Sequence, residues 1–289
     1  MILQKEIIEK AKEWKVPPDT VDKDYVLGHF LSAFIAHYKD ELVFKGGTCL
    51  RKCYIENYRF SEDLDFTALD KNFVLDQKTL QNIAKTTEEN TGILFLVDKI
   101  KPLMFQDEPK GYQVYIKYWG ANHSKNQRPL PPNRWHTKIK LEISTDEIML
   151  LDTETLDIMH PYSDTLMGEN QIRCYSINEV ISEKLRALKQ RSYTAPRDFY
   201  DLYHLTQEFS EENWKMVIPV FVKKMMHKKL AYESPDDLID ASKIANVKRA
   251  WSTSVAHQIT EAHQPSADEI IEIIAERIKT YLPNDKPRK

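Results

Sequence analysis

The sequence lacks several features that would place it in a familiar class of protein. Its 289 residues contain only three cysteines, without a Cys-x-x-Cys pair, and the odd number argues against a disulfide framework. Its formal net charge is −3, so it is neither a strongly basic protein that coats nucleic acid nor an acidic tail. Any contact with nucleic acid must therefore come from a local basic patch.

Signals for membranes, secretion and common cofactors are missing as well. No apolar run approaches the length that spans a bilayer, and charged residues from Lys5 onward come too early for a signal peptide. We therefore expect a cytoplasmic protein without a membrane partner. The Walker A pattern is absent, which argues against a P-loop NTPase. The nine histidines show no HExxH or other paired metal spacing, which argues against zinc.

The order of strand-like and helix-like segments predicts an α+β fold with two regions. Periodicity predicts helices over residues 2–14, 19–37 and 75–91, and strands over 42–44, 63–66, 94–100, 112–118 and 138–144. After residue 161 strand signals fade, apart from residues 172–175, and helices follow, two of them with capping boxes at 176–179 and 266–269. We therefore predict a mixed α/β domain over residues 1–165 and an all-helical domain over residues 166–289.

A glycine turn between a strand and a helix is the most informative motif. Apolar residues 42–44 are followed by Gly46-Gly47-Thr48, and residues 48–58 have the pattern of a helix. Two glycines permit a sharp turn and a close approach of the backbone to a ligand. The free N–H groups at the start of such a helix favour an anion. The segment therefore predicts a phosphate cradle.

Two carboxylates follow this turn on a predicted strand. In Asp63-Leu64-Asp65-Phe66 the acids alternate with apolar residues, so the acids share one face while the apolar pair enters a core. A double-glycine turn or an Asp-x-Asp strand is common by itself. Together, in strand–turn–helix–strand order, they favour a functional site. A phosphate cradle beside paired carboxylates is what metal-assisted nucleotidyl transfer requires.

Four stretches in order along the chain carry a resemblance to a known family. They are 22–25 (Asp-Lys-Asp-Tyr), 44–48 (Phe-Lys-Gly-Gly-Thr), 59–66 (Arg-Phe-Ser-Glu-Asp-Leu-Asp-Phe), and 183–188 with 197–202 (Glu-Lys-Leu-Arg-Ala-Leu and Arg-Asp-Phe-Tyr-Asp-Leu). With these motifs the chain resembles the AbiEii/AbiGii nucleotidyltransferase toxins, which include the MenT-type enzymes, in the DNA polymerase β-like superfamily. The C-terminal helices carry little likeness. Cys49 is a departure, because a small or apolar residue is more usual there.

The resemblance implies a role for each matching residue. The implied nucleotide-binding residues are Gly46, Gly47, Thr48, Ser61 and Lys184; the implied catalytic residues are Asp63, Asp65, Lys184 and Asp198; the implied ligands of Mg²⁺ are Asp63 and Asp65. Ser61 can alternatively be a modification site. The fold implied for the N-terminal domain is that of a polymerase β-like nucleotidyltransferase with a mixed sheet, to whose cleft the helical domain would contribute Lys184 and Asp198.

A neighbouring strand usually supplies a third carboxylate in this superfamily. Residues 138–144 alternate so that Lys138, Lys140, Glu142 and Ser144 share one face. If this strand lies beside residues 63–66, Glu142 becomes the third metal ligand. The alternative is a solvated outer face whose charges pair between alternate residues. We favour the metal site.

The residues of the late motif also have a structural interpretation. Lys184 lies in a helix rich in cations, which composition alone would assign to a solvated face, whereas the family position favours contact with the β- and γ-phosphates. Asp198 and Asp201 share a helical face, so one can be catalytic and the other a scaffold residue. Asp198 can instead pair with Arg197 or Lys184.

Two basic segments are candidates for contact with RNA. The first, residues 214–230, contains Lys215, Lys223, Lys224, Lys228 and Lys229 without an acid, and the second, the loop 122–134, contains Lys125, Arg128 and Arg134. A solvated amphipathic helix is the default interpretation of the first segment. It can bind an RNA backbone if it faces the cleft.

These observations predict an enzyme that transfers a nucleoside monophosphate from an NTP to an acceptor hydroxyl with Mg²⁺. The resemblance implies that the acceptor is a tRNA 3′ end, whose modification would block translation and arrest growth. It also implies a toxin of a toxin–antitoxin or phage-defence system, with a cognate antitoxin. Two alternatives stay open: a small-molecule nucleotidyltransferase of the aminoglycoside-adenylyltransferase type, and a non-catalytic nucleotide-binding module.

Overall fold

The computed structural model describes residues 1–105, 107–124, 126–191, 196–255, 258–259 and 265–284. Its contacts divide the chain into two compact units. The first unit comprises Met1–Glu147 with Thr153–Cys174, and the second comprises Ile148–Asp152 with Tyr175–Lys289. The predicted domain limits at residues 165 and 166 stay a prediction. Lys125 of the predicted basic loop lies outside the described residues.

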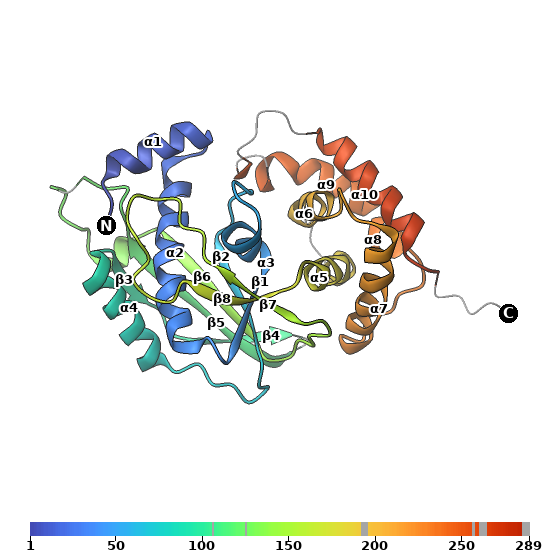
Figure 1. The fold of residues 1–289 in the computed structure, drawn as a ribbon, viewed down its shortest axis with the longest axis horizontal. Coiled ribbons are helices and arrows are strands. Elements are labelled where there is room, and N and C mark those ends of the chain that lie inside the picture. Colours follow the sequence, from blue (N-terminus) through green and yellow to red (C-terminus); the bar gives the residue numbers. More distant parts are fainter. Residues whose placement is uncertain (106, 125, 192–195, 256–257, 260–264, 285–289) are drawn as a thin grey trace. The chain divides into compact units, whose positions relative to one another are not determined.

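A mixed sheet forms the centre of the first unit (Figure 1). Its strands are β1 (Leu42–Lys45), β2 (Asp63–Ala68), β3 (Leu94–Val97), β4 (Lys101–Phe105), β5 (Glu108–Trp119), β6 (Lys138–Ser144), β7 (Thr153–Asp157) and β8 (Gln171–Tyr175). Their order is β3-β5-β6-β2-β1-β8-β7, with β4 paired to β5. Strand β2 is antiparallel to β1 and parallel to β6, and β1 is parallel to β8.

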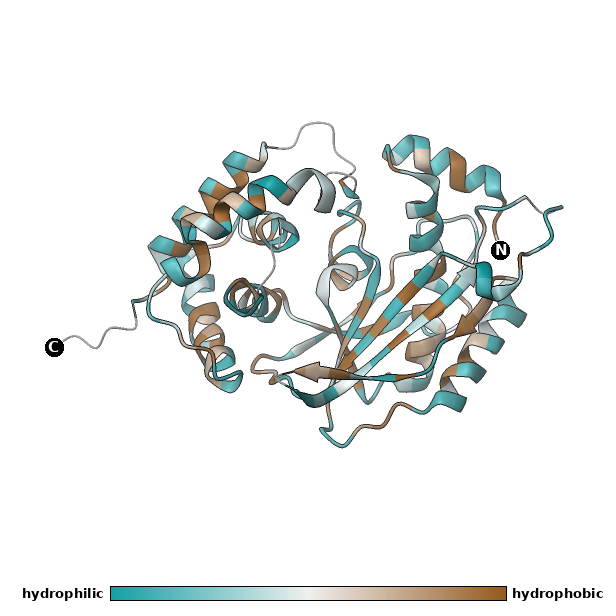
Figure 2. Cartoon of the chain, turned by 180° about the vertical axis from the view of Figure 1, so that it is seen from behind, coloured by the Kyte–Doolittle hydropathy of each residue, from teal (hydrophilic) through white to brown (hydrophobic). Residues whose placement is uncertain are grey.

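Alternating apolar residues fix the register of the central strands. Leu64 and Phe66 of β2 are fully buried, as are the three apolar residues of β6, whereas Asp63 and Asp65 are half-buried. Figure 2 shows this alternation as brown and teal bands along the strands. A shift of one residue would move every one of these side chains to the opposite face of the sheet. The register therefore fixes the position of the acids.

Helices α1 (Gln4–Trp14), α2 (Pro18–Tyr38) and α4 (Gln77–Thr91) complete the first unit. Helix α2 packs against α4 and β6, and α4 packs against β3. Asp76 caps α4 by accepting a hydrogen bond from the Thr79 N–H, and Gly92, with a φ of 76°, ends it directly after residue 91, the predicted last residue. The predicted helix over residues 48–58 is instead a short α3 (Gly46–Cys49) that continues into a π-helical turn, η1 (Leu50–Tyr54).

The second unit is helical and has its own core. Its helices are α5 (Ile177–Gln190), α6 (Pro196–Leu205), α7 (Glu211–His227), α8 (Asp236–Ile239), α9 (Ala241–Ser254) and α10 (Ala267–Tyr281). The predicted capping box before α10 is complete, with Ser266 and Glu269 bonding to each other's N–H groups. The box before α5 is only half formed, because the Glu179 carboxylate forms an ion pair with Lys224 instead of capping the helix.

Strands β4 and β7 were not expected from the sequence. Both carry largely exposed or half-exposed residues, so they lack the apolar alternation that marks a strand beside a core. Pro102 lies in β4, at the edge of the sheet, where a proline is tolerated. No helix in the described part of the chain is long and apolar enough to cross a membrane.

Candidate active site

The glycine turn between β1 and α3 lies directly against the acids of β2. Gly46 has a φ of 80°, which favours glycine. A Cβ added at Gly46 would lie 2.5 Å from Asp65 Oδ2, and one added at Gly47 would lie 2.9 Å from Arg59 Nη2 and from Ser61 Oγ. Both positions are therefore too crowded for a larger residue. The turn brings the backbone of the predicted cradle next to Asp65 and Ser61, two further residues predicted for the site.

Thr48 ties this turn to β2. Its hydroxyl is buried and donates a hydrogen bond to the backbone carbonyl of Asp63. The group that Thr48 can offer a phosphate is therefore its backbone N–H rather than its hydroxyl. The π-helical turn that follows α3 is a rare conformation, which occurs most often as a single turn near functional sites.

The third predicted carboxylate lies on the strand next to the acid pair. Strand β6 runs parallel to β2, with Glu142 opposite Asp65 in the register, so the condition set from the sequence is met. Glu142 Oε1 accepts a hydrogen bond of 2.7 Å from Gln113 and lies 2.8 Å from Lys140 Nζ. The charge pair expected for a solvated face is thus also present. Asp63, Asp65 and Glu142 lie on the same face of the sheet.

The electrostatic surroundings of Asp65 favour a cation. Burial, together with the negative charges of Asp63 and Glu142, raises the pKa of Asp65 to about 7, although Lys45 and Lys140 act in the opposite direction. A carboxylate in such surroundings is stabilised in its charged form by a nearby positive charge. Carboxylate oxygens are the ligands that hard divalent cations such as Mg²⁺ prefer. The residues present therefore fit a divalent metal ion.

The three acids are spaced more widely than the ligands of a single, tightly enclosed ion. Among the described residues, two other clusters bring three donor atoms within 4.8 Å of one another: Cys49, Cys53 and Cys174, and His29, His160 and Asp164. The carboxylate oxygens of Asp63, Asp65 and Glu142 do not all lie within this distance of one another. A site for two ions about 3.5–4 Å apart requires a wider set of ligands.

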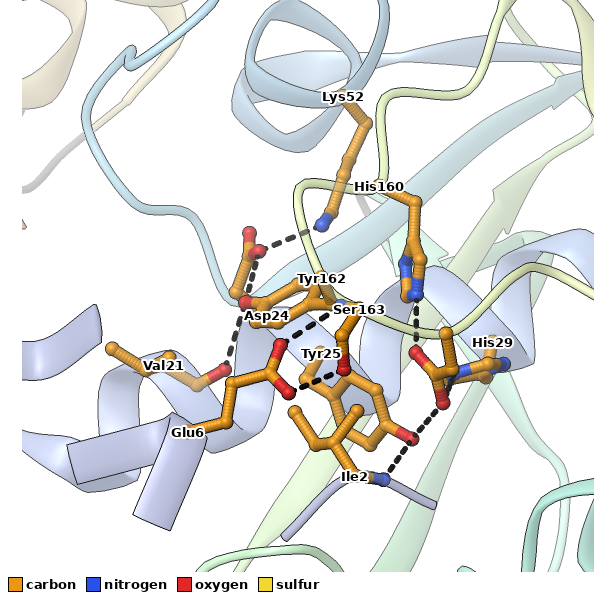
Figure 3. A network of polar contacts seen from close by, with 11 residues as sticks. Ile2, Glu6, Val21, Asp24, Tyr25, His29, Lys52, His160, Tyr162 and Ser163 are labelled. Atoms are coloured by element: carbon orange, nitrogen blue, oxygen red, sulfur yellow. Dashed lines mark hydrogen bonds and ion pairs between the residues drawn. The ribbon is translucent and has the colours of Figure 1, made fainter. Parts of the chain in front are cut away.

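The motif at residues 22–25 organises the helix behind the cradle, a role that the sequence did not reveal. Asp24 lies 2.7 Å from Arg51 Nε. It also lies 2.7 Å from Lys52 Nζ and accepts a hydrogen bond of 2.8 Å from Tyr162 (Figure 3). Burial alone would raise the pKa of Asp24, but the charges of Arg51 and Lys52 outweigh it and hold the pKa well below its usual range. These ion pairs fasten η1 to α2. Charged residues inside an otherwise apolar helix were the available signal.

The other acid of that motif holds a loop. Asp22 accepts hydrogen bonds from the N–H groups of Ala121 and Asn122, at 2.6 and 3.1 Å. Burial raises its pKa to about 7. A Cβ at Gly120 would lie 2.5 Å from the Asp22 carboxylate, so the loop after β5 approaches this acid with its bare backbone. Asp22 therefore anchors the start of the loop 122–134.

The late motif forms a buried charge cluster in the second unit. Lys184 Nζ lies 2.5 Å from Asp201 Oδ2 and 3.2 Å from Asp198 Oδ1, and Asp198 also pairs with Arg191. Lys184, Asp198 and Asp201 are all buried. Of the structural alternatives for Asp198, pairing with Lys184 is the one that occurs, whereas Arg197 Nε donates to the Ser254 carbonyl. The shared action of Lys184 and Asp198 with the acids of β2 stays a prediction.

The lysines of α7 and of the two residues that follow it do not form one exposed cationic face. Lys224 is buried, lies 2.6 Å from Glu179 Oε1, and donates a hydrogen bond to the Ile148 carbonyl. Lys228 is buried as well, whereas Lys215, Lys223 and Lys229 are exposed. The inclusion of Lys224 and Lys228 among the candidates for RNA was therefore wrong. The partner of Lys224 is the buried carboxylate of Glu179 on α5. The sequence of α7 alone therefore does not reveal that Lys224 is buried.

The sequence matches the family described as nucleotidyl transferase AbiEii toxin, type IV toxin–antitoxin system, over residues 29–273. The chain belongs to this family. The predicted family is confirmed, and with it the prediction of a nucleotidyltransferase that uses an NTP.

Comparison with solved structures supports the fold. MenT4, a nucleotidyltransferase toxin of Mycobacterium tuberculosis H37Rv, is similar over 99% of this chain and 92% of its own, with a TM-score of 0.62 and 18% identity. The predicted α+β fold is thereby confirmed. An antigenic nucleotidyltransferase-like protein of Paracoccidioides brasiliensis aligns over 73% of this chain and 96% of its own, at 12% identity, but its TM-score of 0.31 supports no conclusion. No curated protein matches the sequence.

Proposed function

We propose that this toxin transfers a nucleoside monophosphate from an NTP to the 3′ end of tRNA in a Mg²⁺-dependent reaction. Such a change at the tRNA 3′ end would block translation and arrest growth, which suits phage defence. A cognate antitoxin would counter it, as in a type IV toxin–antitoxin system. The reaction breaks the bond between the α- and β-phosphates, forms a bond from the acceptor oxygen to the α-phosphorus, and releases pyrophosphate.

One observation carries the proposal: a backbone turn suited to phosphate lies in contact distance of a carboxylate suited to metal. A Cβ at Gly46 would lie only 2.5 Å from Asp65 Oδ2, so the backbone of the turn closely approaches the acid of β2. A triphosphate held by the turn would therefore place its oxygens beside the metal ligands. Positioning and charge neutralisation are the main catalytic tasks in phosphoryl transfer.

The residues of the first unit would divide the work. Asp63, Asp65 and Glu142 would hold the Mg²⁺, which would neutralise the triphosphate and lower the pKa of the attacking hydroxyl. The N–H groups that follow Gly46 would orient the phosphates, and Ser61 would add a hydroxyl beside Gly47. Asp65, with a pKa of about 7, must lose its proton before it binds the metal.

Lys184 and Asp198 are proposed to act on the triphosphate from the second unit. Lys184 Nζ is already 2.5 Å from Asp201. To contact a phosphate, the ammonium would therefore have to bind it together with Asp201 or in place of Asp201. An ammonium has three N–H donors, so Lys184 could bind a phosphate oxygen and still keep at least one of its two carboxylate partners.

The test is an incubation of the purified protein with total tRNA and each labelled NTP, with Mg²⁺ or with a chelator. We expect label on tRNA with one or more NTPs in the presence of Mg²⁺ only. The matched control is the same tRNA after periodate oxidation, which destroys its 3′-terminal diol and should abolish labelling. Equal labelling of the oxidised tRNA would contradict the 3′ end as acceptor. NTP turnover without label on RNA would favour a small-molecule acceptor.

A further inference from the structure

The three cysteines of the chain meet at one point in the first unit. Cys49 ends α3, Cys53 lies in η1, and Cys174 lies on β8, more than a hundred residues later. Their sulfur atoms all lie within 4.8 Å of one another. The sequence alone discloses only that Cys49 and Cys53 stand four residues apart. The structure adds the third sulfur.

The local fold explains why the three side chains converge. Residues four apart on a helix lie on the same side, which brings Cys53 beside Cys49. Strand β8 runs parallel to β1 and pairs Cys174 with Phe44, the residue two positions before the glycine turn. Cys49 and Cys174 are buried, whereas Cys53 is partly exposed. The cluster is therefore enclosed on two sides and open to solvent through Cys53.

The chemistry of this cluster suits a thiophilic cation. Cysteine sulfur is one of the ligands that zinc binds in proteins. A tetrahedral zinc ion with Zn–S bonds of about 2.3 Å holds its sulfur ligands about 3.8 Å apart. Sulfurs within 4.8 Å of one another need only a small inward movement to reach that spacing. In a chain without a disulfide framework, clustered cysteines are more typical of metal sites than of structural disulfides.

We propose that Cys49, Cys53 and Cys174 bind one zinc ion. The fourth position is left to water or to Glu154 of β7, a carboxylate near enough to act on Cys174. Binding replaces the thiol protons, which are released to solvent. The ion would join α3 and η1 to β8 directly behind the glycine turn, because Cys49 follows Thr48. The expectation from histidine spacing that zinc is absent is thereby revised.

A second cluster in the same unit provides the internal control. His29, His160 and Asp164 also approach one another closely, and Figure 3 labels the two histidines. The Asp164 carboxylate, however, already accepts a hydrogen bond of 2.6 Å from Tyr25 and lies 3.0 Å from His160 Nε2. Tyr25 and His160 thus already use part of its capacity to accept hydrogen bonds. Because these contacts compete with a metal ion, the second cluster serves as the control for zinc binding.

The experiment measures metal in the full-length protein, purified under reducing conditions without chelator. Elemental analysis should find about one zinc ion per chain in the wild type and in H29Q. It should find none in C49S, C174S and the double variant C49S/C174S. Circular dichroism identifies any variant that fails to fold. The wild type then supplies a second readout: after zinc removal, Co²⁺ should produce the ultraviolet absorption of cobalt–thiolate bonds.

Each contrary outcome is distinct. Reduced wild type that contains no zinc and shows no cobalt–thiolate absorption would overturn the proposal. Zinc retained in folded C174S, or lost in H29Q, would place the metal elsewhere. A wild-type mass lower by two hydrogens, restored by reductant, would show a disulfide in place of a metal site. None of these readouts depends on nucleotidyl transfer, so the inference fails or stands separately from the proposed function.

Discussion

Two groups of carboxylates in this chain lie in family motifs but have opposite electrostatic surroundings. On β2 and β6, Asp63 and Glu142 lie near Asp65 and raise its pKa to about 7, together with burial. In the second unit, Asp198 and Asp201 share the ammonium of Lys184. Like charges are gathered in the first group, whereas opposite charges are gathered in the second.

The difference shows which group needs a ligand to be stable. A buried acid beside two others is held in its charged form only at a free-energy cost, which an added cation would remove. The late motif already contains its cation. Its charges can stabilise the helical unit without any ligand. A structural role therefore already explains why these charged residues occur in the motif, before any role in catalysis is considered. The following predictions test this contrast, from the largest expected effect to the smallest.

Removing an acid of β2 should abolish transfer and spare the fold. For D63A or D65A we expect a loss of about a thousandfold in kcat, since a metal ion supplies several kcal/mol of charge stabilisation in the transition state. Thermal melting should show a folded protein, because neither side chain fills the core. D70A, an exposed acid after the same strand, is the matched control and should keep its activity. Full activity in a folded D65A would refute the metal assignment.

Removing the cation of the late motif should instead unfold the protein more easily. In K184M two buried carboxylates lose the ammonium that they share, and we expect a loss of about 3–5 kcal/mol in unfolding free energy by urea titration. The triple variant K184M/D198N/D201N should recover much of this stability, because the two buried carboxylates are then neutral. If Lys184 also contacts the triphosphate, the KM for NTP should stay raised in that triple variant. Wild-type NTP kinetics there would leave Lys184 with a structural role alone.

Two neighbouring lysines of α7 should behave differently in the same assay. K224M leaves Glu179 buried without its ion pair and should cost about 3–5 kcal/mol in unfolding free energy. K223M changes an exposed side chain and should stay within about 0.5 kcal/mol of the wild type. Equal urea midpoints for the two variants would contradict the burial of Lys224.

The pH dependence of stability should report the crowding of the acids. The pKa of Asp65 in the folded chain, about 7, lies above its unfolded value, so its contribution to stability is complete below about pH 4 and is lost as the pH rises through 7. Without divalent metal, D65N should therefore gain roughly 4 kcal/mol on the wild type between pH 4 and pH 8. Urea titrations at both pH values would measure this. Parallel behaviour of the two proteins would mean that Asp65 is not perturbed.

The smallest effect concerns RNA. Replacing the exposed residues Lys223, Lys229, Arg128 and Arg134 by alanine should weaken tRNA binding about equally for all tRNAs. It should also flatten the salt dependence of binding by roughly one unit of slope per lost phosphate contact. Filter binding over a salt series measures the slope. An unchanged slope would mean that RNA, if it binds, is held by other residues.

Local patterns predicted the fold well, whereas partners far apart in sequence escaped prediction. The alternation in β2 and β6 disclosed which faces are buried, and the predicted end of a helix at residue 91 was correct, because each depends on a few consecutive residues. The edge strand β7 was missed since it has little core to face. Helix α3 begins two residues earlier than predicted and ends in a π-helical turn, a conformation without a sequence signature.

The candidate site followed the same rule. Gly46 and Asp65 could be placed near each other from the strand–turn–helix order, and Glu142 could be added only on a condition about strand order. The burial of Lys224 by Glu179 and the approach of Cys174 to Cys49 depend on contacts across many residues. A single sequence contains no local trace of such pairs.

The short segment Ile148–Asp152 makes it difficult to cut the toxin into two fragments that correspond to its two units. It belongs to the second unit although the chain on both sides of it belongs to the first, so the polypeptide passes between the units three times. Glu179 accepts hydrogen bonds from the N–H groups of Leu150 and Leu151, and Lys224 donates to the Ile148 carbonyl. A fragment that began at Tyr175 would therefore lose five residues of its own unit, and with them the main-chain groups that bind a buried acid and a buried cation. The helical unit is thus completed by a piece of chain that only the full-length polypeptide delivers.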